Sequence, residues 1–139
     1  MQVQYLLDTN ICIYIIKYQP EIVRQYFEKH LPHRNILISA ITLGELRFGA
    51  EKSQHTEKAL KVIDELTSMI QVVELDENVA HHYAEIRQNF ASKGQIIGAN
   101  DLWLAAHARA NHWVMVTNNE KEFTRVDGLK VENWVSNPL

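Results

Sequence analysis

The amino-acid sequence predicts an α/β fold with a central parallel sheet of four to five strands and helices on both faces. Short apolar runs alternate with helical patterns along the chain, which is typical of a parallel sheet covered on both sides. The chain has 139 residues, of which 46% are hydrophobic and 22% charged, as expected for a single core. We therefore expect one domain over residues 1–139.

The apolar and helical patterns define the order of the elements. Five runs have the length and composition of strands: Val3–Leu7, Ile36–Ile38, Gln71–Leu75, Trp113–Val116 and Leu129–Val131. Helical patterns separate them: Thr9–Lys17, Pro20–Leu31, Leu43–Lys52, Thr56–Met69, Glu77–Lys93 and Asn100–Ala110. Pro20 suits a first helical turn, and Gly94 suits the position after a helix. The polar segments His33–Asn35 and Gln95–Gly98 are predicted to be surface loops.

Composition and charge narrow the functional class. The single cysteine, Cys12, excludes an internal disulfide, and its apolar neighbours predict that it is buried. The N-terminal segment has no basic region, and its apolar run ends at Lys17, short of the ~20 residues that span a bilayer. We expect a cytoplasmic protein with no membrane partner. The net charge of −3 argues against broad, non-specific affinity for nucleic acid.

Acidic and polar residues stand where predicted strands give way to helices. Asp8 directly follows the first strand, and Glu45 and Asp101 occupy comparable transitions. Thr117-Asn118-Asn119 follows a later strand. Because the carboxyl ends of parallel strands meet at one edge of a sheet, we expect these side chains to converge there.

Each acid also has a purely structural interpretation. Asp8 can cap the helix that begins at Thr9. Thr42-Leu43-Gly44-Glu45 matches a capping box, in which Glu45 would reach back to the amide of Thr42. Asp101 lies in a first helical turn, where the helix dipole favours a negative charge.

The three acids together predict a bound divalent cation. Carboxylates ~4 Å apart repel by about 4 kcal/mol per pair at an effective dielectric of ~20, which requires a raised pKa or a counter-ion. Mg2+ or Mn2+ suits carboxylate oxygens. The spacing of His107 and His112 does not suit zinc, and the adjacent His81 and His82 point in different directions.

A carboxylate-held Mg2+ predicts chemistry on phosphate esters, because it polarises a phosphoryl oxygen and activates a bound water. Asp8 and Asp101 are the expected direct ligands, and Glu45 completes the site or positions the nucleophile. Supporting hydrogen bonds are expected from three further side chains, those of Asn10, Thr117 and Asn119.

Three basic residues are candidate contacts to phosphate or to a partner. They are Arg34, Arg47 and Lys93. Arg47 is two residues from Glu45 and therefore points to a different helix face. We interpret it as a solvated or partner-facing charge rather than a catalytic group.

Four motifs occur in the order and spacing of a known family. They are Leu7–Asn10, Ser39–Ala50, Asn100–Ala108 and Val116–Phe123. In these motifs the sequence resembles the PIN-domain ribonucleases, and within them the VapC toxins of bacterial toxin–antitoxin modules. The resemblance implies a single PIN-like domain and a Mg2+-dependent endoribonuclease that cuts structured RNA, with the anticodon region of tRNA as one candidate.

The resemblance also assigns residues and partners. It maps the family's acids onto Asp8, Glu45 and Asp101, and it places Asn119 where many members have a fourth acid. It leaves open whether Glu120 substitutes for that acid. One essential metal ion is therefore expected. The implied partners are an antitoxin that covers the active-site groove, a second copy of the chain in a homodimer, and operator DNA contacted only through the antitoxin.

Two other functions remain open from the sequence. A phosphoryl-handling domain, such as a receiver or a phosphatase, could use Asp8 as nucleophile, but Asp8-Thr9-Asn10 lacks the second aspartate of the common phosphatase signature. A catalytically silent module could keep the fold only to bind an antitoxin, and the intact set of acids argues against this.

Overall fold

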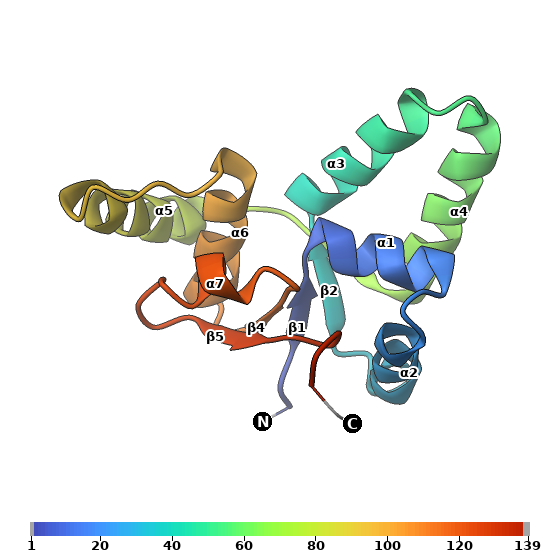
Figure 1. The fold of residues 1–139 in the computed structure, drawn as a ribbon, viewed down its shortest axis with the longest axis horizontal. Helices are drawn as coiled ribbons and strands as arrows, with labels where there is room; N and C mark the ends of the chain where they lie inside the picture. The colour runs from blue at the N-terminus through green and yellow to red at the C-terminus, as the bar shows by residue number, and fades with distance from the viewer. Residues whose placement is uncertain (1, 138–139) are drawn as a thin grey trace.

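The computed structural model describes residues 2–137 and contains one parallel sheet in the order β3-β2-β1-β4-β5 (Figure 1). The strands are β1 (Tyr5–Leu7), β2 (Ile36–Ser39), β3 (Gln71–Val73), β4 (Val114–Val116) and β5 (Lys130–Glu132). Each strand overlaps its predicted run, with both ends within two residues of the predicted ones, and each pair of neighbours is parallel. The predicted fold class is confirmed.

The helices occupy the intervals expected for them. They are α1 (Thr9–Lys17), α2 (Glu21–His30), α3 (Ala40–Glu51), α4 (Thr56–Met69), α5 (Glu77–Ser92), α6 (Ala99–Ala110) and α7 (Glu120–Phe123), with a 3-10 helix η1 (Leu31–His33) after α2. The sequence patterns did not predict η1 or α7. Both are single turns, which are too short to show helical periodicity.

Two local predictions are wrong. Helix α3 begins three residues earlier than expected, because the Ser39 hydroxyl accepts a hydrogen bond from the Ile41 amide at 3.1 Å and caps the helix. Thr42 and Glu45 therefore form no capping box. Asn35 is buried instead of lying in a surface loop, and its side-chain amide donates to the Val3 carbonyl at 2.9 Å.

Alternate residues of the strands face two apolar layers. Leu7 and Ile38 pack in a cluster with helices α1 to α4, and Leu6 and Leu37 pack in a second cluster with α5, α6 and α7. Figure 1 shows these two groups of helices on opposite sides of the strands. Cys12 is fully buried in the first cluster, as predicted. Across residues 2–137, the helices are too short or too polar to cross a bilayer.

The strand register places the functional edge of the sheet. Leu7 pairs with Val116 across β1 and β4, and Leu6 pairs with Leu37 across β1 and β2. Asp8 and Thr117 directly follow the first pair, and the second pair places Ser39, two residues after Leu37, level with Asp8. The three side chains therefore lie next to one another at the carboxyl ends of three adjacent strands.

Candidate active site

Asp8 occupies the centre of this edge and is 6% exposed. Its Oδ1 accepts a hydrogen bond from the Ile11 amide at 2.9 Å, which caps α1, and its Oδ2 accepts from the Thr117 hydroxyl at 2.5 Å. Burial raises the pKa of Asp8, the two hydrogen bonds oppose the rise, and the charge of Glu45 adds to it. Each oxygen keeps a lone pair, so the capping role leaves Asp8 able to bind a cation.

Glu45 is held against α1 by a hydrogen bond. Its Oε1 accepts from the Thr9 hydroxyl at 2.7 Å, which joins α3 to the residue immediately after Asp8. Glu45 is only partly buried, and its charge contributes to the raised pKa values of both Asp8 and Asp101. The structure therefore brings Glu45 to the acidic site that the sequence predicted.

Asp101 lies in the first turn of α6, as expected, and it does not stand alone. Its pKa is raised to about 7, first by burial, then by a hydrogen bond and charge from Glu122, and further by the charges of Asp8 and Glu45. Two carboxyl groups can hydrogen-bond each other only when one of them carries a proton. The repulsion predicted from the sequence thus appears as a raised pKa of Asp101.

Glu122 is the site residue that the sequence analysis missed. It accepts hydrogen bonds from the Gly98 amide at 3.3 Å and from the Asn119 side-chain amide at 3.1 Å, in addition to its bond with Asp101. Helix α7 thus brings Glu122 to Asp101, whereas the sequence left open whether Glu120 takes part.

Glu120 points away from the other acids. Its Oε1 accepts hydrogen bonds from the Asn133 side chain at 2.9 Å and from the Ser136 hydroxyl at 3.4 Å, near the C-terminus. Residues two apart on a helix face different directions, and Phe123, three residues after Glu120, is buried. The buried side chain of Phe123 defines the inner face of α7, and Glu120 and Glu122 lie in different directions relative to it. The apolar Phe123 was therefore the signal in the sequence that could have separated the two acids.

The predicted supporting residues divide into two groups. Thr117 is fully buried, donates to Asp8, and accepts a hydrogen bond from the Asn119 amide at 2.9 Å. Asn119 in turn holds Glu122. Asn10 lies exposed on α1, and no hydrogen bond links its side chain to the acids within residues 2–137.

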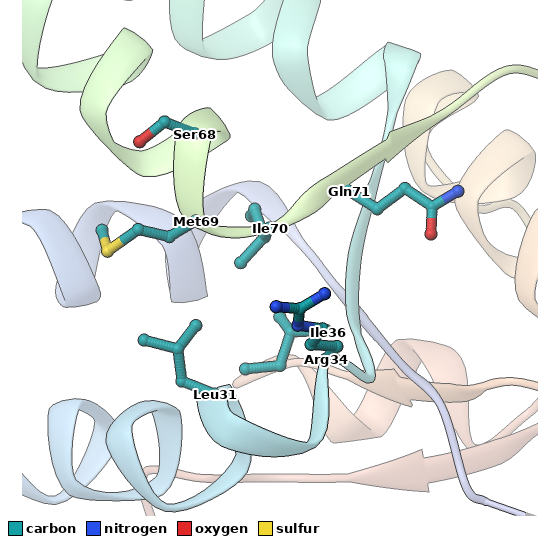
Figure 2. Close-up of a pocket in the computed structure, with 7 residues that line it drawn as sticks. All are labelled: Leu31, Arg34, Ile36, Ser68, Met69, Ile70 and Gln71. Atoms are coloured by element: carbon teal, nitrogen blue, oxygen red, sulfur yellow. The ribbon is translucent and has the colours of Figure 1, made fainter.

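The three basic candidates do not gather at the acids. Arg47 forms a 3.7 Å ion pair from its Nη1 to Asp64 of α4, and Lys93 follows the end of α5. Arg34 precedes β2, so the length of that strand separates it from the acidic edge by roughly 15 Å at ~3.3 Å per residue. Figure 2 shows Arg34 beside a cavity of about 440 Å3 that Leu31, Ile36, Ser68, Met69, Ile70 and Gln71 also line.

An open groove runs beside Glu45. One part, of about 770 Å3, lies between α1, α3 and the start of α6 and includes Phe48, which is 65% exposed. A second part, of about 590 Å3, lies between α1, α3 and α4. Both parts are lined by Ile13, Glu45 and Gly49. A long polymer could therefore reach the acids from the α3 side.

The donor set suits a hard divalent cation. The candidate ligands are the carboxylate oxygens of Asp8, Glu45, Asp101 and Glu122, and none of the described histidines is among them. Within residues 2–137, no three acidic, histidine or cysteine side chains are drawn together tightly enough to hold an ion as they stand. Binding would therefore require side-chain rotation and loss of the proton shared by Asp101 and Glu122.

The family described as the PIN domain matches residues 5–129, which include all four acids. The chain belongs to the PIN-domain family. The tRNA(fMet)-specific endonuclease VapC of Shigella flexneri is 44% identical over 131 residues, covering 94% of this chain and 98% of that protein. Ribonuclease VapC2 of Haemophilus influenzae (strain ATCC 51907 / DSM 11121 / KW20 / Rd) is 39% identical over 132 residues, covering 95% and 98%.

A solved structure agrees with these relatives. VapBC2 from Rickettsia felis, bound to a DNA fragment from their promoter, matches with a TM-score of 0.89 and 38% identity over 95% of this chain and 99% of that chain. The resemblance to the VapC group inferred from the motifs is confirmed. The relatives also favour a nuclease over the receiver or phosphatase-like alternative.

Proposed function

We propose that this PIN domain is a Mg2+- or Mn2+-dependent endoribonuclease that acts as the toxin of a toxin–antitoxin pair. The observation that carries the proposal is the meeting of Asp8, Glu45, Asp101 and Glu122 at one edge of the sheet, within electrostatic reach of Asp101. Relatives named as ribonucleases cover almost the whole chain, which supports the same activity.

A Mg2+ ion held at this site would supply Lewis-acid polarisation of the phosphodiester and would make a nearby water more acidic. Asp8 and Asp101 would hold it, with Glu45 and Glu122 completing the set. Thr117 and the Ile11 amide fix the orientation of Asp8, and the Thr9 hydroxyl fixes Glu45. The Asp101–Glu122 pair would give up its shared proton when the ion binds.

We propose a structured RNA, and tRNA in particular, as the substrate. The support is the 44% identity to a relative named as a tRNA(fMet)-specific endonuclease. Cleavage in the anticodon region is the candidate position. The groove beside Glu45 offers Lys52, and its second part offers Lys17 and Lys58, as cations for the phosphate backbone.

An antitoxin segment is the proposed occupant of the same groove in the inhibited state. The α1–α3–α4 part is largely apolar, which suits an amphipathic helix, and Glu45 in its lining would pair with a basic side chain. The promoter DNA bound by the Rickettsia felis VapBC2 complex supports operator binding. We propose that the antitoxin makes those contacts, that the toxin forms a homodimer, and that it acts in the cytoplasm.

Purified protein and a panel of defined RNAs test this function. We expect cleavage of tRNA with Mg2+ or Mn2+ and none after chelation. Asp8→Asn and Asp101→Asn should each abolish cleavage while circular dichroism shows a folded protein. Metal-independent cleavage would overturn the mechanism. Tight antitoxin binding by a wild-type protein that cleaves no RNA would support the catalytically silent alternative.

A further inference from the structure

A buried histidine connects the two helices that carry Glu45 and Asp101. His107 of α6 is 1% exposed, and its Nδ1 lies 3.0 Å from the Oγ of Ser39. Ser39 is fully buried at the end of β2, where its Oγ also accepts the Ile41 amide that begins α3. The contact therefore joins segments 68 residues apart in the chain.

The surroundings fix the protonation and tautomer of this imidazole. Burial lowers the pKa of His107, while a hydrogen bond to the backbone of Glu74 and the charge of Asp76 oppose the fall. The Ser39 Oγ already accepts the Ile41 amide, so its own proton is free to be donated to Nδ1 of the neutral ring.

The position of this hydrogen bond relates it to the acids. Glu45 lies six residues after Ser39, and Asp101 lies six residues before His107, on the two helices that the bond joins. Among the described residues, this is the one hydrogen bond between α6 and either β2 or α3. The bond to Glu74 extends the link to the segment after β3.

We propose that His107 is a positioning residue, which acts through Ser39 to set the placement of Glu45 relative to Asp101. The inference rests on the proposed nuclease function. Apolar packing holds α3 and α6 in the fold, but it does not fix the rotation of α3 about its axis as a directional hydrogen bond does. Displacements of ~1 Å in a catalytic group can reduce a rate by about a hundredfold.

Four variants separate this role from simple packing. His107→Leu fills similar space but leaves Ser39 without its acceptor. His107→Asn keeps an acceptor oxygen near the place of Nδ1. Leu104→Ala, a buried change on the same helix, removes stability without touching the bond. His107→Leu is also made in a Ser39→Ala background.

Two readouts are measured on the folded fraction of each variant. The first is steady-state tRNA cleavage with Mn2+, which gives kcat and KM. The second is Mn2+ affinity without RNA, measured by electron paramagnetic resonance. We expect His107→Leu to lower kcat by about tenfold to a hundredfold, with KM within about twofold, and to weaken Mn2+ binding by a similar factor. His107→Asn should recover most of both losses.

The pattern across the variants decides the inference. Leu104→Ala should lower the Tm but keep kcat and Mn2+ affinity, and His107→Leu should add little in the Ser39→Ala background. The positioning role is overturned if His107→Leu and Leu104→Ala behave alike, or if His107→Asn is as impaired as His107→Leu. If wild-type protein cleaves no RNA, the proposed function fails, and the Mn2+ affinities alone then decide the role of His107.

Discussion

Replacing Glu122 by glutamine should impair catalysis, whereas the same change at Glu120 should not. The two residues lie two positions apart in α7, are chemically identical, and face different parts of the molecule. Glu122 hydrogen-bonds Asp101, and Glu120 accepts from Asn133 and Ser136. The pair is therefore a matched test of which acid completes the site.

The size of the effect follows from the charges. Full charges ~4 Å apart repel by about 4 kcal/mol at an effective dielectric of ~20. Asp101 is half-buried and shares a proton with Glu122, so solvent screening and protonation leave about 1 kcal/mol of that repulsion at pH 7. Glu122→Gln should remove it and raise the Tm of the metal-free protein by about 3 °C.

The same change removes a carboxylate from the proposed metal site. We expect Mn2+ affinity and kcat to fall by about tenfold to a hundredfold. Glu120→Gln keeps an acceptor oxygen for Asn133 and should leave kcat within about twofold.

Cleavage of a fluorescent tRNA substrate and thermal unfolding with and without Mn2+ measure these effects. The placement of Glu122 is wrong if Glu120→Gln is the more damaging change, or if Glu122→Gln cleaves at the wild-type rate.

Three further predictions use the same protein. The folded pKa of Asp101 is about 7 and its ordinary value is 3.8, so the metal-free protein should lose stability as the pH rises from about 4 to about 7. Saturating Mn2+ should remove this loss above pH 7, and Tm values measured over a pH series check both expectations. Asp8→Asn keeps Oδ1 as the cap of α1, so the free energy of unfolding of the metal-free protein, measured in urea, should fall by less than about 1 kcal/mol. A larger fall would show that the charge of Asp8 is needed for capping. Phe48→Ala should change the free energy of unfolding by no more than about 0.5 kcal/mol, because the side chain is 65% exposed. The same change should weaken antitoxin binding at least about tenfold in calorimetry, and an unchanged affinity would remove Phe48 from the proposed interface.

The sequence predicts the sheet well because its signals are local. Runs such as Ile36–Ile38 are fully buried and show no alternation, so their shortness, set against the long helical patterns around them, identifies them as strands. The same reasoning fails for α7 and for Asn35. A four-residue helix has no period to detect, and whether a polar residue is buried depends on a distant partner, which for Asn35 is the Val3 carbonyl.

The candidate site was predictable as far as strand ends define it. Asp8 follows from the end of a strand and Asp101 from the start of a helix that follows a loop, whereas Glu122 depends on the rotation of a single turn. The importance of His107 was not visible either, because a histidine in the apolar sequence Leu104–Ala108 has the pattern of an ordinary core residue. Its partner, Ser39, is 68 residues away.

The two interpretations of Asp8 that the sequence left open turn out to be compatible. A helix N-terminus stabilises a carboxylate through amide hydrogen bonds and the dipole, and the carboxyl end of a parallel strand leads directly into such a terminus. Asp8 accepts the Ile11 amide, and Asp101 sits in the first turn of α6. The helix starts thus offset part of the repulsion between the acids. This explains how the chain can fold with its acids together before a cation binds, and why the remaining repulsion appears as the raised pKa of Asp101.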